Sequence, residues 1–229
     1  MELLAGLVES RLPHDARAWL ADARAQAARG DVNGLATVYT AAAVRVGRAP
    51  LAASAADAAA LAAAAPLAGV GFDRWTLTDG VRAVLLASRR TAGRAGEAFA
   101  ADALACFDLC DAGEQQSWLR AASLWPEAEA LRAVVIDACR TNILPLFEAV
   151  ACENPYPARY FPERNFNQMV LKAMFNGVAL SRIVGLPERR NADLARMARD
   201  YAAERRAAGR SVPGDIGLAL EGPAAQEMA

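Results

Sequence analysis

The stretch LATVYTAAAVRVGRAP, residues 35–50, carries the pattern that decides the fold class of this chain. Its apolar residues recur at the three- and four-residue spacing of one face of an α-helix. The residues on that face are Leu35, Val38, Tyr39, Ala42 and Val46. Gly47 and Pro50 then end the pattern, because glycine commonly terminates a helix and proline cannot continue one. The stretch therefore predicts an amphipathic helix with one buried face.

The same punctuation recurs on both sides of this stretch. Before it, Pro13 predicts the start of a helix that ends at Gly30, and after it Ser54 predicts the N-cap of a short alanine-rich helix. Further helices are predicted to begin near Thr78, Glu97, Glu114, Glu127, Pro145, Asn165 and Asn191. No alternating strand pattern of useful length is present. The sequence therefore predicts an all-α protein whose antiparallel helix pairs form a HEAT-like α-α superhelix or an irregular bundle.

Length, composition and charge narrow the class of protein further. We expect one all-helical domain over residues 1–211, with its most distinctive half at 113–208, followed by a flexible tail at 212–229. A net charge of −1 argues against a nucleic-acid partner, because such proteins carry a basic surface. No apolar run reaches the roughly 20 residues of a membrane span, and the first residues lack the pattern of a secretory signal. The expected location is the cytoplasm.

The cysteines and the single histidine predict no metal site. Cys106, Cys110, Cys139 and Cys152 form no Cys-x-x-Cys pair, and His14 lies far from them in sequence. In a cytoplasmic protein, scattered cysteines of this kind usually act as small buried apolar residues. No glycine-rich phosphate loop or other cofactor fingerprint is present either, so we expect neither a metal nor a cofactor.

The composition changes in residues 139–176, where amides, aromatic rings and prolines accumulate. Within this stretch, Pro155, Pro157 and Pro162 predict that residues 152–163 form a non-helical loop. The loop combines stiff backbone with aromatic rings, which suit core packing and ligand contact alike. We expect this loop to be ordered against the helix that follows it.

A polar stripe runs along that following helix. Asn165, Gln168, Lys172 and Asn176 recur every three or four residues, while the other faces are apolar. A helix that is apolar nearly all round is predicted to be buried, so its polar side chains need partners. The first two residues of the stripe also match an N-cap and its reciprocal partner, which by itself would explain both amides.

Lys172 is the only lysine in a chain rich in arginine. A lysine suits a site that accepts a compact ammonium group rather than a planar guanidinium group. We predict that Lys172 and Glu153 belong to one buried polar cluster bordered by Tyr156, Tyr160 and Asn176. The lysine would either anchor the loop, through a salt bridge or backbone carbonyls, or line a cavity of roughly 300 Å³ or more that holds a small molecule.

The longest motif reads CRTNxLPxFEA from Cys139, followed by ACENPYPAxYFPExNFNQMVLKAxF from Ala151. This motif resembles the EboA family. The similarity continues through residues 191–201 and 207–210, with a weaker echo at 45–51, whereas the N-terminal half resembles the family only in helicity and length. The resemblance implies an operon that also encodes a UbiA-like membrane prenyltransferase, a TatD-like hydrolase and sugar-isomerase-like barrels. It implies a role in the traffic or maturation of secondary metabolites, including export of pigment precursors, and it supplies no catalytic residues.

Three functions are compatible with these observations. The first is an accessory protein of metabolite traffic that binds an apolar small molecule, or other proteins of such an operon including the prenyltransferase, through the 139–176 motif. The candidate ligand-binding residues are Arg140, Asn142, Glu148, Glu153, Asn154, Tyr156, Tyr160, Phe161, Asn167, Gln168, Lys172 and Asn176. The second is a cofactor-independent enzyme acting on a hydrophobic, isoprenoid-derived metabolite, with Glu153, Glu148 and Lys172 as acid–base groups. The third is a helical scaffold that uses the motif only for protein docking. The absence of a nucleophile–base pair weighs against the enzyme.

Overall fold

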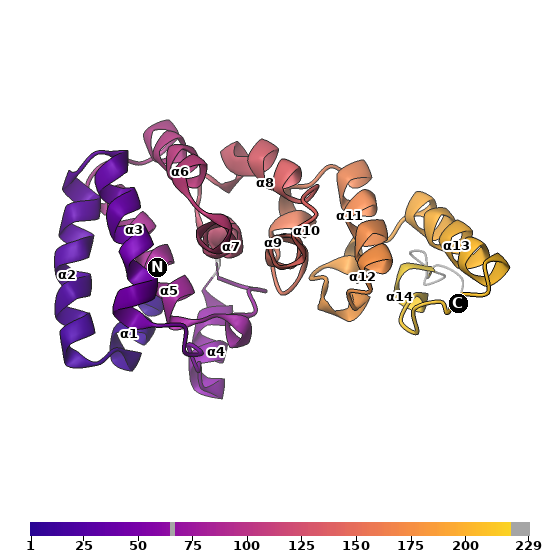
Figure 1. Ribbon diagram of the computed structural model, residues 1–229, viewed down its shortest axis with the longest axis horizontal. Coiled ribbons are helices and arrows are strands. Elements are labelled where there is room, and N and C mark those ends of the chain that lie inside the picture. The colour runs from indigo at the N-terminus through magenta and orange to yellow at the C-terminus, as the bar shows by residue number, and fades with distance from the viewer. Residues whose placement is uncertain (65–66, 221–229) are drawn as a thin grey trace.

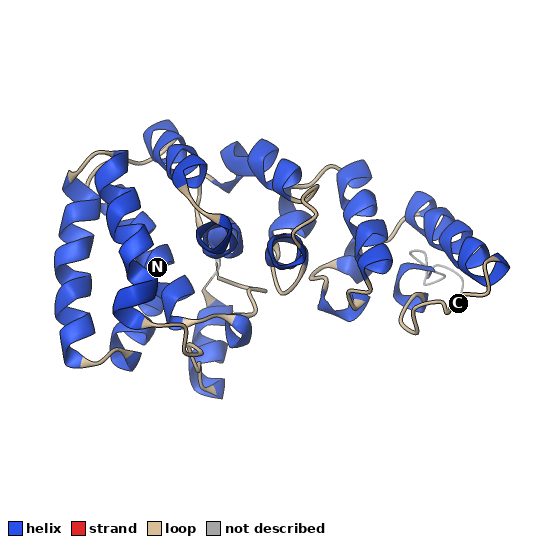
Figure 2. Cartoon of the chain, viewed as in Figure 1, coloured by secondary structure: helices blue, strands red, loops and turns tan. Residues whose placement is uncertain are grey.

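The computed structural model describes residues 1–64 and 67–220, and within them it contains fourteen α-helices and no β-strand (Figure 2). The prediction of an all-α protein is confirmed. The extended pairing that remains in this part of the chain is a single isolated bridge between Pro50 and Thr76.

The helices follow one another in chain order along the long axis of the molecule (Figure 1). The first seven are α1 Glu2–Arg11, α2 His14–Arg29, α3 Val32–Val46, α4 Ala55–Ala63, α5 Leu77–Thr91, α6 Glu97–Leu109 and α7 Ala112–Ala121. The second seven are α8 Arg132–Ala138, α9 Leu144–Ala151, α10 Tyr156–Tyr160, α11 Glu163–Asn176, α12 Leu186–Arg189, α13 Ala192–Ala207 and α14 Gly217–Leu220. Helices α1, α2, α3 and α5 form a bundle at one end, and α13 and α14 lie at the other.

Helix α5 is the centre of the N-terminal bundle. It packs against α1, α2, α3 and α7 and is buried along almost its entire length. Thr76 and Asp79 cap its first turn through reciprocal hydrogen bonds between side chain and backbone. Gly80 allows the close approach of α1, because a Cβ atom at this position would lie 2.6 Å from Val8 Cγ2. The result is a helix that carries polar residues into the core.

Several local predictions are confirmed. Gly30 ends α2, Ser54 forms a capping box with Asp57 at the start of α4, and Asn191 caps α13 by accepting a hydrogen bond from the Leu194 amide. Pro145 lies in the first turn of α9, where a missing amide hydrogen costs nothing. Short-range sequence signals therefore locate most helix ends correctly.

The predicted loop at 152–163 is wrong in one respect, since residues Tyr156–Tyr160 form helix α10. Pro155 is its N-cap and Pro157 lies in its first turn, so neither proline is asked to donate an intrahelical hydrogen bond. Tyr156, Pro157 and Phe161 are buried against the rest of the chain. The prolines thus shorten and position a helix rather than exclude one.

Helix α11 also departs from the prediction. It begins at Glu163, directly after Pro162, so Asn165 is not its N-cap and no side chain caps this end. Its buried residues lie on one side, while Gln168 and Asn176 are exposed to solvent. Phe175, predicted to be buried, is 61% exposed. Two of the four stripe residues therefore face solvent and the other two, Asn165 and Lys172, are half-buried, because the helix covers the core with only one face.

The flexible tail was expected at residues 212–229. Within that stretch, residues Gly217–Leu220 form α14, Ala219 is fully buried, and Asp215 accepts a hydrogen bond of 2.6 Å from the Leu180 amide. Residues 221–229 lie outside the described part of the chain. The packed region thus extends beyond the predicted boundary at residue 211.

Candidate functional site

Lys172 anchors the chain segment that follows α8. Its Nζ atom donates hydrogen bonds to the carbonyl oxygens of Cys139, at 2.9 Å, and Thr141, at 2.6 Å. It also stands 5.2 Å from the centroid of the Phe147 ring. Carbonyls at the end of a helix lack intrahelical donors and favour a nearby cation. The prediction that Lys172 and Glu153 belong to one polar cluster is wrong, because Glu153 binds Arg182, while the predicted alternative of an anchor on backbone carbonyls describes this lysine.

A small cavity lies beside Lys172. Its volume is about 80 Å³, and its lining includes Arg140, Phe161, Asn165 and Gln168 from the predicted motif. This volume is well below the roughly 300 Å³ expected of a site for a small molecule. The cavity therefore does not have the size predicted for a ligand site next to the lysine.

A larger hollow gathers other predicted residues. We call it the polar hollow; it measures about 200 Å³ and is lined by Gly71, Arg74, Trp75, Arg120, Glu148, Cys152, Glu153, Asn154 and Arg182. Arg182 is its central cation. Its Nε and Nη2 atoms donate to the two carboxylate oxygens of Glu153, at 2.8 and 3.0 Å, and its Nη1 atom donates to Glu148, at 2.8 Å. The hydrogen bonding to Glu153, and to a smaller extent that to Glu148, raises the pKa of Arg182, which therefore stays charged.

The backbone of Glu153 is held in an unusual conformation. Its φ angle is +50°, a region that non-glycine residues enter at a cost of about 1–3 kcal/mol. Two hydrogen bonds hold it there: its amide donates to the Arg182 carbonyl at 2.9 Å, and its carbonyl accepts from the Gly71 amide at 2.8 Å. A Cβ atom at Gly71 would lie only 2.4 Å from Glu153 Cβ. This close approach closes the polar hollow on one side.

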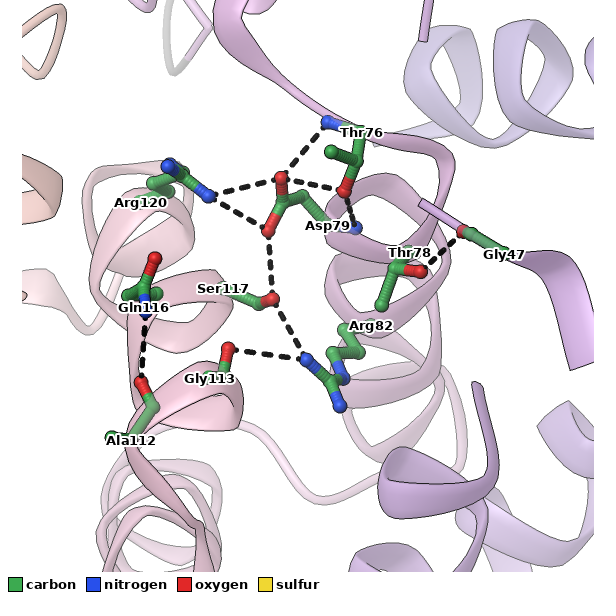
Figure 3. A network of polar contacts seen from close by, with 10 residues as sticks. All are labelled: Gly47, Thr76, Thr78, Asp79, Arg82, Ala112, Gly113, Gln116, Ser117 and Arg120. Carbon is green, nitrogen blue, oxygen red and sulfur yellow. Dashed lines mark hydrogen bonds and ion pairs between the residues drawn. The ribbon is translucent and has the colours of Figure 1, made fainter. Parts of the chain in front are cut away.

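Arg120 also lines the hollow and is fixed by a buried network centred on Asp79 (Figure 3). Arg120 Nη1 donates to both carboxylate oxygens of Asp79 at 3.1 Å. Ser117 donates to the same carboxylate at 2.7 Å, and Arg82 donates to the Ser117 hydroxyl at 3.1 Å. Thr76 completes the network through its amide and hydroxyl groups. The wall is therefore positioned by α5 and α7 together.

Two of the predicted ligand-binding residues have all their polar groups occupied within the protein. The Asn154 amide donates to the carbonyls of Leu119 and Ala149, and its oxygen accepts from the Tyr156 amide. The Tyr156 hydroxyl donates to the Ala128 carbonyl at 2.5 Å, and burial raises the pKa of this phenol. Both residues are buried, so they fix the position of α10.

Asn167 likewise has a partner inside the fold. Its amide exchanges two hydrogen bonds of 3.0 Å with Asn191, the residue that caps α13. Tyr160 and Phe161 pack their rings against Tyr156, with centroids 4.8 and 6.2 Å away. The amide pair joins α11 to the start of α13, whereas the ring contacts lie within α10 and its C-terminal cap.

The remaining predicted residues lie apart from one another. Asn142, Gln168 and Asn176 are exposed, and none of them forms a side-chain hydrogen bond with another described residue. Arg140 is exposed and 3.6 Å from the carboxylate of Asp137. The twelve candidates thus divide among the polar hollow, the Lys172 cavity, the solvent-exposed surface and internal structural contacts.

A third and larger depression is an open groove of about 680 Å³ between α6, α7, α8 and α9. We call it the apolar groove; it is lined by Phe107, Asp108, Gln115, Leu119, Ala133, Val134, Asp137, Ala138, Arg140, Thr141, Ile143 and Leu146. Leu119 and Leu146 are buried, whereas Ile143 is 48% exposed. Arg140 is the one predicted ligand-binding residue among these.

Comparison with known proteins identifies the family to which the chain is similar. The model of the family described as metabolite traffic protein EboA matches residues 1–221.

The chain belongs to the EboA family.

No curated protein and no solved structure matches the chain. The EboA match extends through the N-terminal half, for which the sequence motif had indicated similarity in helicity and length alone. None of the helices in the described part of this EboA-family chain combines the length and the apolar character needed to cross a membrane.

The cysteines of this EboA-family chain are free thiols. Cys106, Cys139 and Cys152 are buried, as the sequence predicts for small apolar residues, whereas Cys110 is only partly buried. Burial raises the pKa of Cys139 and of Cys152 to about 12, so both remain protonated at neutral pH. Among the described residues, no three His, Cys, Asp or Glu side chains are grouped as metal ligands would be.

Sequence reasoning missed the arginines of the polar hollow and most of the apolar groove. Arg74, Arg120 and Arg182 come from three separate segments, and nothing in their local pattern distinguishes them from the other arginines. The groove combines residues from four helices, each of which reads as an ordinary amphipathic segment. One signal was available, because the proximity of Glu148 and Glu153 in sequence predicts a need for a cation.

Proposed function

We propose that this EboA-family protein is an accessory of metabolite traffic that binds a largely apolar small molecule in the apolar groove. The observation that supports this most strongly is the groove itself, whose volume of about 680 Å³ falls within the usual 300–1,000 Å³ of small-molecule sites. One wall of the groove comes from the start of the 139–176 motif, through Arg140, Thr141, Ile143 and Leu146.

The chemistry of the lining suits a ligand with an apolar body and few polar groups. Leu119 and Leu146 form an apolar base, and Phe107 and Val134 add apolar sides. Burying apolar ligand surface there gains roughly 25 cal/mol per Å² before the costs of association. The charged residues of the lining, Asp108, Asp137 and Arg140, are exposed and could contact a polar end of the ligand.

The enzyme alternative has less support. Glu148 and Glu153 are both paired with Arg182, while Lys172 donates to backbone carbonyls in a different cavity. An acid–base pair must reach the same reacting atoms. A partner protein, for example the membrane prenyltransferase of the operon, is the alternative occupant of this groove. The experiment below distinguishes a partner protein from a small molecule.

The test uses a fluorescent, uncharged apolar probe, N-phenyl-1-naphthylamine, with wild-type protein and the variants Val134→Arg and Ile143→Arg. A long cationic side chain in the groove should fill it and disturb its apolar lining. We expect probe binding at least tenfold weaker in each variant, with an unchanged circular dichroism spectrum and melting temperature. Competition by apolar extracts of the source cells would then show whether a natural ligand occupies the same place.

A matched control comes from the other end of the molecule. Leu3 is 53% exposed and lines a second open groove of about 470 Å³ between α1 and α4. Leu3→Arg should leave probe binding unchanged. Equal loss in the control, or normal binding in Ile143→Arg, would contradict the proposed site. A wild-type protein that binds no apolar probe but captures an operon partner through this face would favour the docking alternative.

A further inference from the structure

We propose that the polar hollow is a second binding site, which takes a small dipolar molecule carrying an oxyanion at one end and an ammonium group at the other. The hollow shares no lining residue with the apolar groove, so the two sites can be tested separately. The inference goes beyond the proposed traffic function and does not depend on it.

Two guanidinium groups supply unused donors for the oxyanion. Arg120 uses only Nη1 to bind Asp79, and its Nε and Nη2 atoms have no partner in residues 1–64 and 67–220. Arg74 is 64% exposed, and its closest carboxylate oxygen, on Asp73, is 3.5 Å from its Nε atom. Paired guanidinium N–H groups match the geometry of carboxylate and phosphate oxygens. These two arginines therefore form the end of the site that binds the oxyanion.

Glu148 supplies an unused acceptor for the ammonium group. Glu153 alone satisfies Arg182 Nε and Nη2, so Glu148 adds a second negative charge to a cation that is already paired. Only Glu148 Oε1 has a partner in the described part of the chain. Glu148, Glu153 and Arg182 together carry a net charge of −1. The Oε2 atom of Glu148 is therefore available to accept a hydrogen bond from an additional cation.

The hollow is preorganised. The strained φ angle of Glu153 persists because its amide and carbonyl are bonded to Arg182 and Gly71. Backbone strain of this kind is found most often where a fixed geometry serves binding. Trp75, 2% exposed, forms an apolar wall, and the protonated Cys152 thiol adds no charge. A volume of about 200 Å³ lies below the roughly 300–1,000 Å³ of sites for drug-sized ligands, so the hollow suits only a molecule of a few heavy atoms, such as an amino acid of the size of β-alanine.

The experiment compares β-alanine, which carries both groups, with propionate and propylammonium, which carry one each. Binding is followed by NMR through the Nε–H signals of Arg74, Arg120 and Arg182 and the indole N–H of Trp75. We expect β-alanine to bind at least tenfold more tightly than either half-molecule. Comparing the affinities of glycine and 4-aminobutyrate with that of β-alanine shows which separation between the two charges the site prefers. If no dipolar member of the series shifts these signals at millimolar concentration, the proposal is overturned.

Two conservative variants assign the ends of the ligand. Glu148→Gln should reduce β-alanine affinity to that of propionate, because it removes the charge that selects the ammonium group while Glu153 still pairs Arg182. Arg74→Gln should weaken the binding of β-alanine and of propionate by about tenfold, because it removes one of the two guanidinium groups that bind the carboxylate. The fold should be unchanged, since Arg74 is exposed and pairs with no buried carboxylate. Glu129→Gln, at an exposed ion pair outside the hollow, is the matched control and should change nothing.

The same measurements separate this site from the apolar groove. Ile143→Arg should bind β-alanine normally, and Glu148→Gln should bind the apolar probe normally. An unchanged ratio of β-alanine to propionate affinity in Glu148→Gln would disprove the dipolar site even if the apolar groove is confirmed.

Discussion

The N-terminal half of the chain and the 139–176 motif differ in which polar residues they bury. Among the described residues, the charged side chains that are fully buried all lie between residues 79 and 114, and none is more than 4% exposed. They are Asp79, Arg82, Arg89, Asp102 and Glu114. In the motif, the buried polar residues are two amides, Asn154 and Asn167, while Glu148, Glu153 and Lys172 remain partly accessible.

The difference shows that unusual composition does not indicate where charges are buried. The N-terminal half uses arginine, the commonest cation of this chain, to pair buried carboxylates and to donate hydrogen bonds to buried carbonyls. Arg89 binds Asp102 through Nε and Nη2, at 2.9 and 2.7 Å, and also donates to the carbonyls of Ala27 and Gly30 near the end of α2. The motif keeps its charges near the surface, where they can meet a ligand. Four predictions test this contrast, from the largest expected effect to the smallest.

The largest effect should follow removal of the buried arginine. Arg89→Met leaves Asp102 with Arg94 as its remaining partner and leaves the carbonyls of Ala27 and Gly30 without this donor. Breaking a buried ion pair costs about 3–5 kcal/mol. We expect a loss of that size in the free energy of unfolding measured with urea. Arg196→Met, at an exposed pair on α13, should change it by less than about 1 kcal/mol. Similar losses in the two variants would refute the assigned importance of the buried network.

Adding one carbon at Gly71 should have the next largest effect. The new Cβ atom would lie 2.4 Å from Glu153 Cβ, so either the loop or the strained glutamate must move. Overpacking of this kind costs about 1–3 kcal/mol, and it should also shift the NMR signal of Arg182. Gly6→Ala on α1 is the control, because no atom lies within 4 Å of its new Cβ, and there we expect a gain of roughly 0.5–1 kcal/mol. Unchanged stability in Gly71→Ala would contradict the close approach.

Lys172→Met should destabilise the protein by about 1–3 kcal/mol, because the carbonyls of Cys139 and Thr141 lose a charged donor. Ligand binding in the apolar groove should fall only as the folded fraction falls, which is the behaviour of an anchor. Lys172→Arg should recover part of the stability, since a planar guanidinium group fits two carbonyls around a compact ammonium site less well. Loss of binding in a fully folded Lys172→Met protein would instead assign the lysine to a ligand.

The smallest effect is the acid sensitivity of Asp102. Burial by itself would raise the pKa of this carboxyl, but hydrogen bonds from Arg94 and Arg89 outweigh burial and lower it below 3.8. Because the folded pKa is the lower one, the stabilisation is present above pH 3.8 and is lost as the pH falls through the folded value. Urea midpoints of the wild type should therefore fall with acid below this pH more steeply than those of Asp102→Asn. Parallel pH profiles would exclude the contribution of Asp102.

Local sequence patterns determined the helical class, the apolar faces and most helix ends. Leu35, Val38, Tyr39 and Ala42 are buried as their spacing predicts, because the 3.6-residue period acts within one helix. The same locality explains the errors at α10 and α11. Proline and asparagine signals describe the local conformations that a residue permits, whereas the packing of neighbouring segments decided that Pro157 lies in the first turn of a helix and that Asn165 does not cap one.

Only the tertiary structure decided which charges meet and where the surface is hollow. Arg74, Arg120 and Arg182 lie far apart in sequence, and their convergence on the polar hollow depends on how the loop before α5, the end of α7 and the turn after α11 are brought together. The apolar groove likewise forms only where four helices, α6, α7, α8 and α9, pack together. The physical reason is range: side-chain spacing fixes which face of a helix is buried, whereas ion pairs and cavities depend on the relative positions of helices that the chain separates by tens of residues.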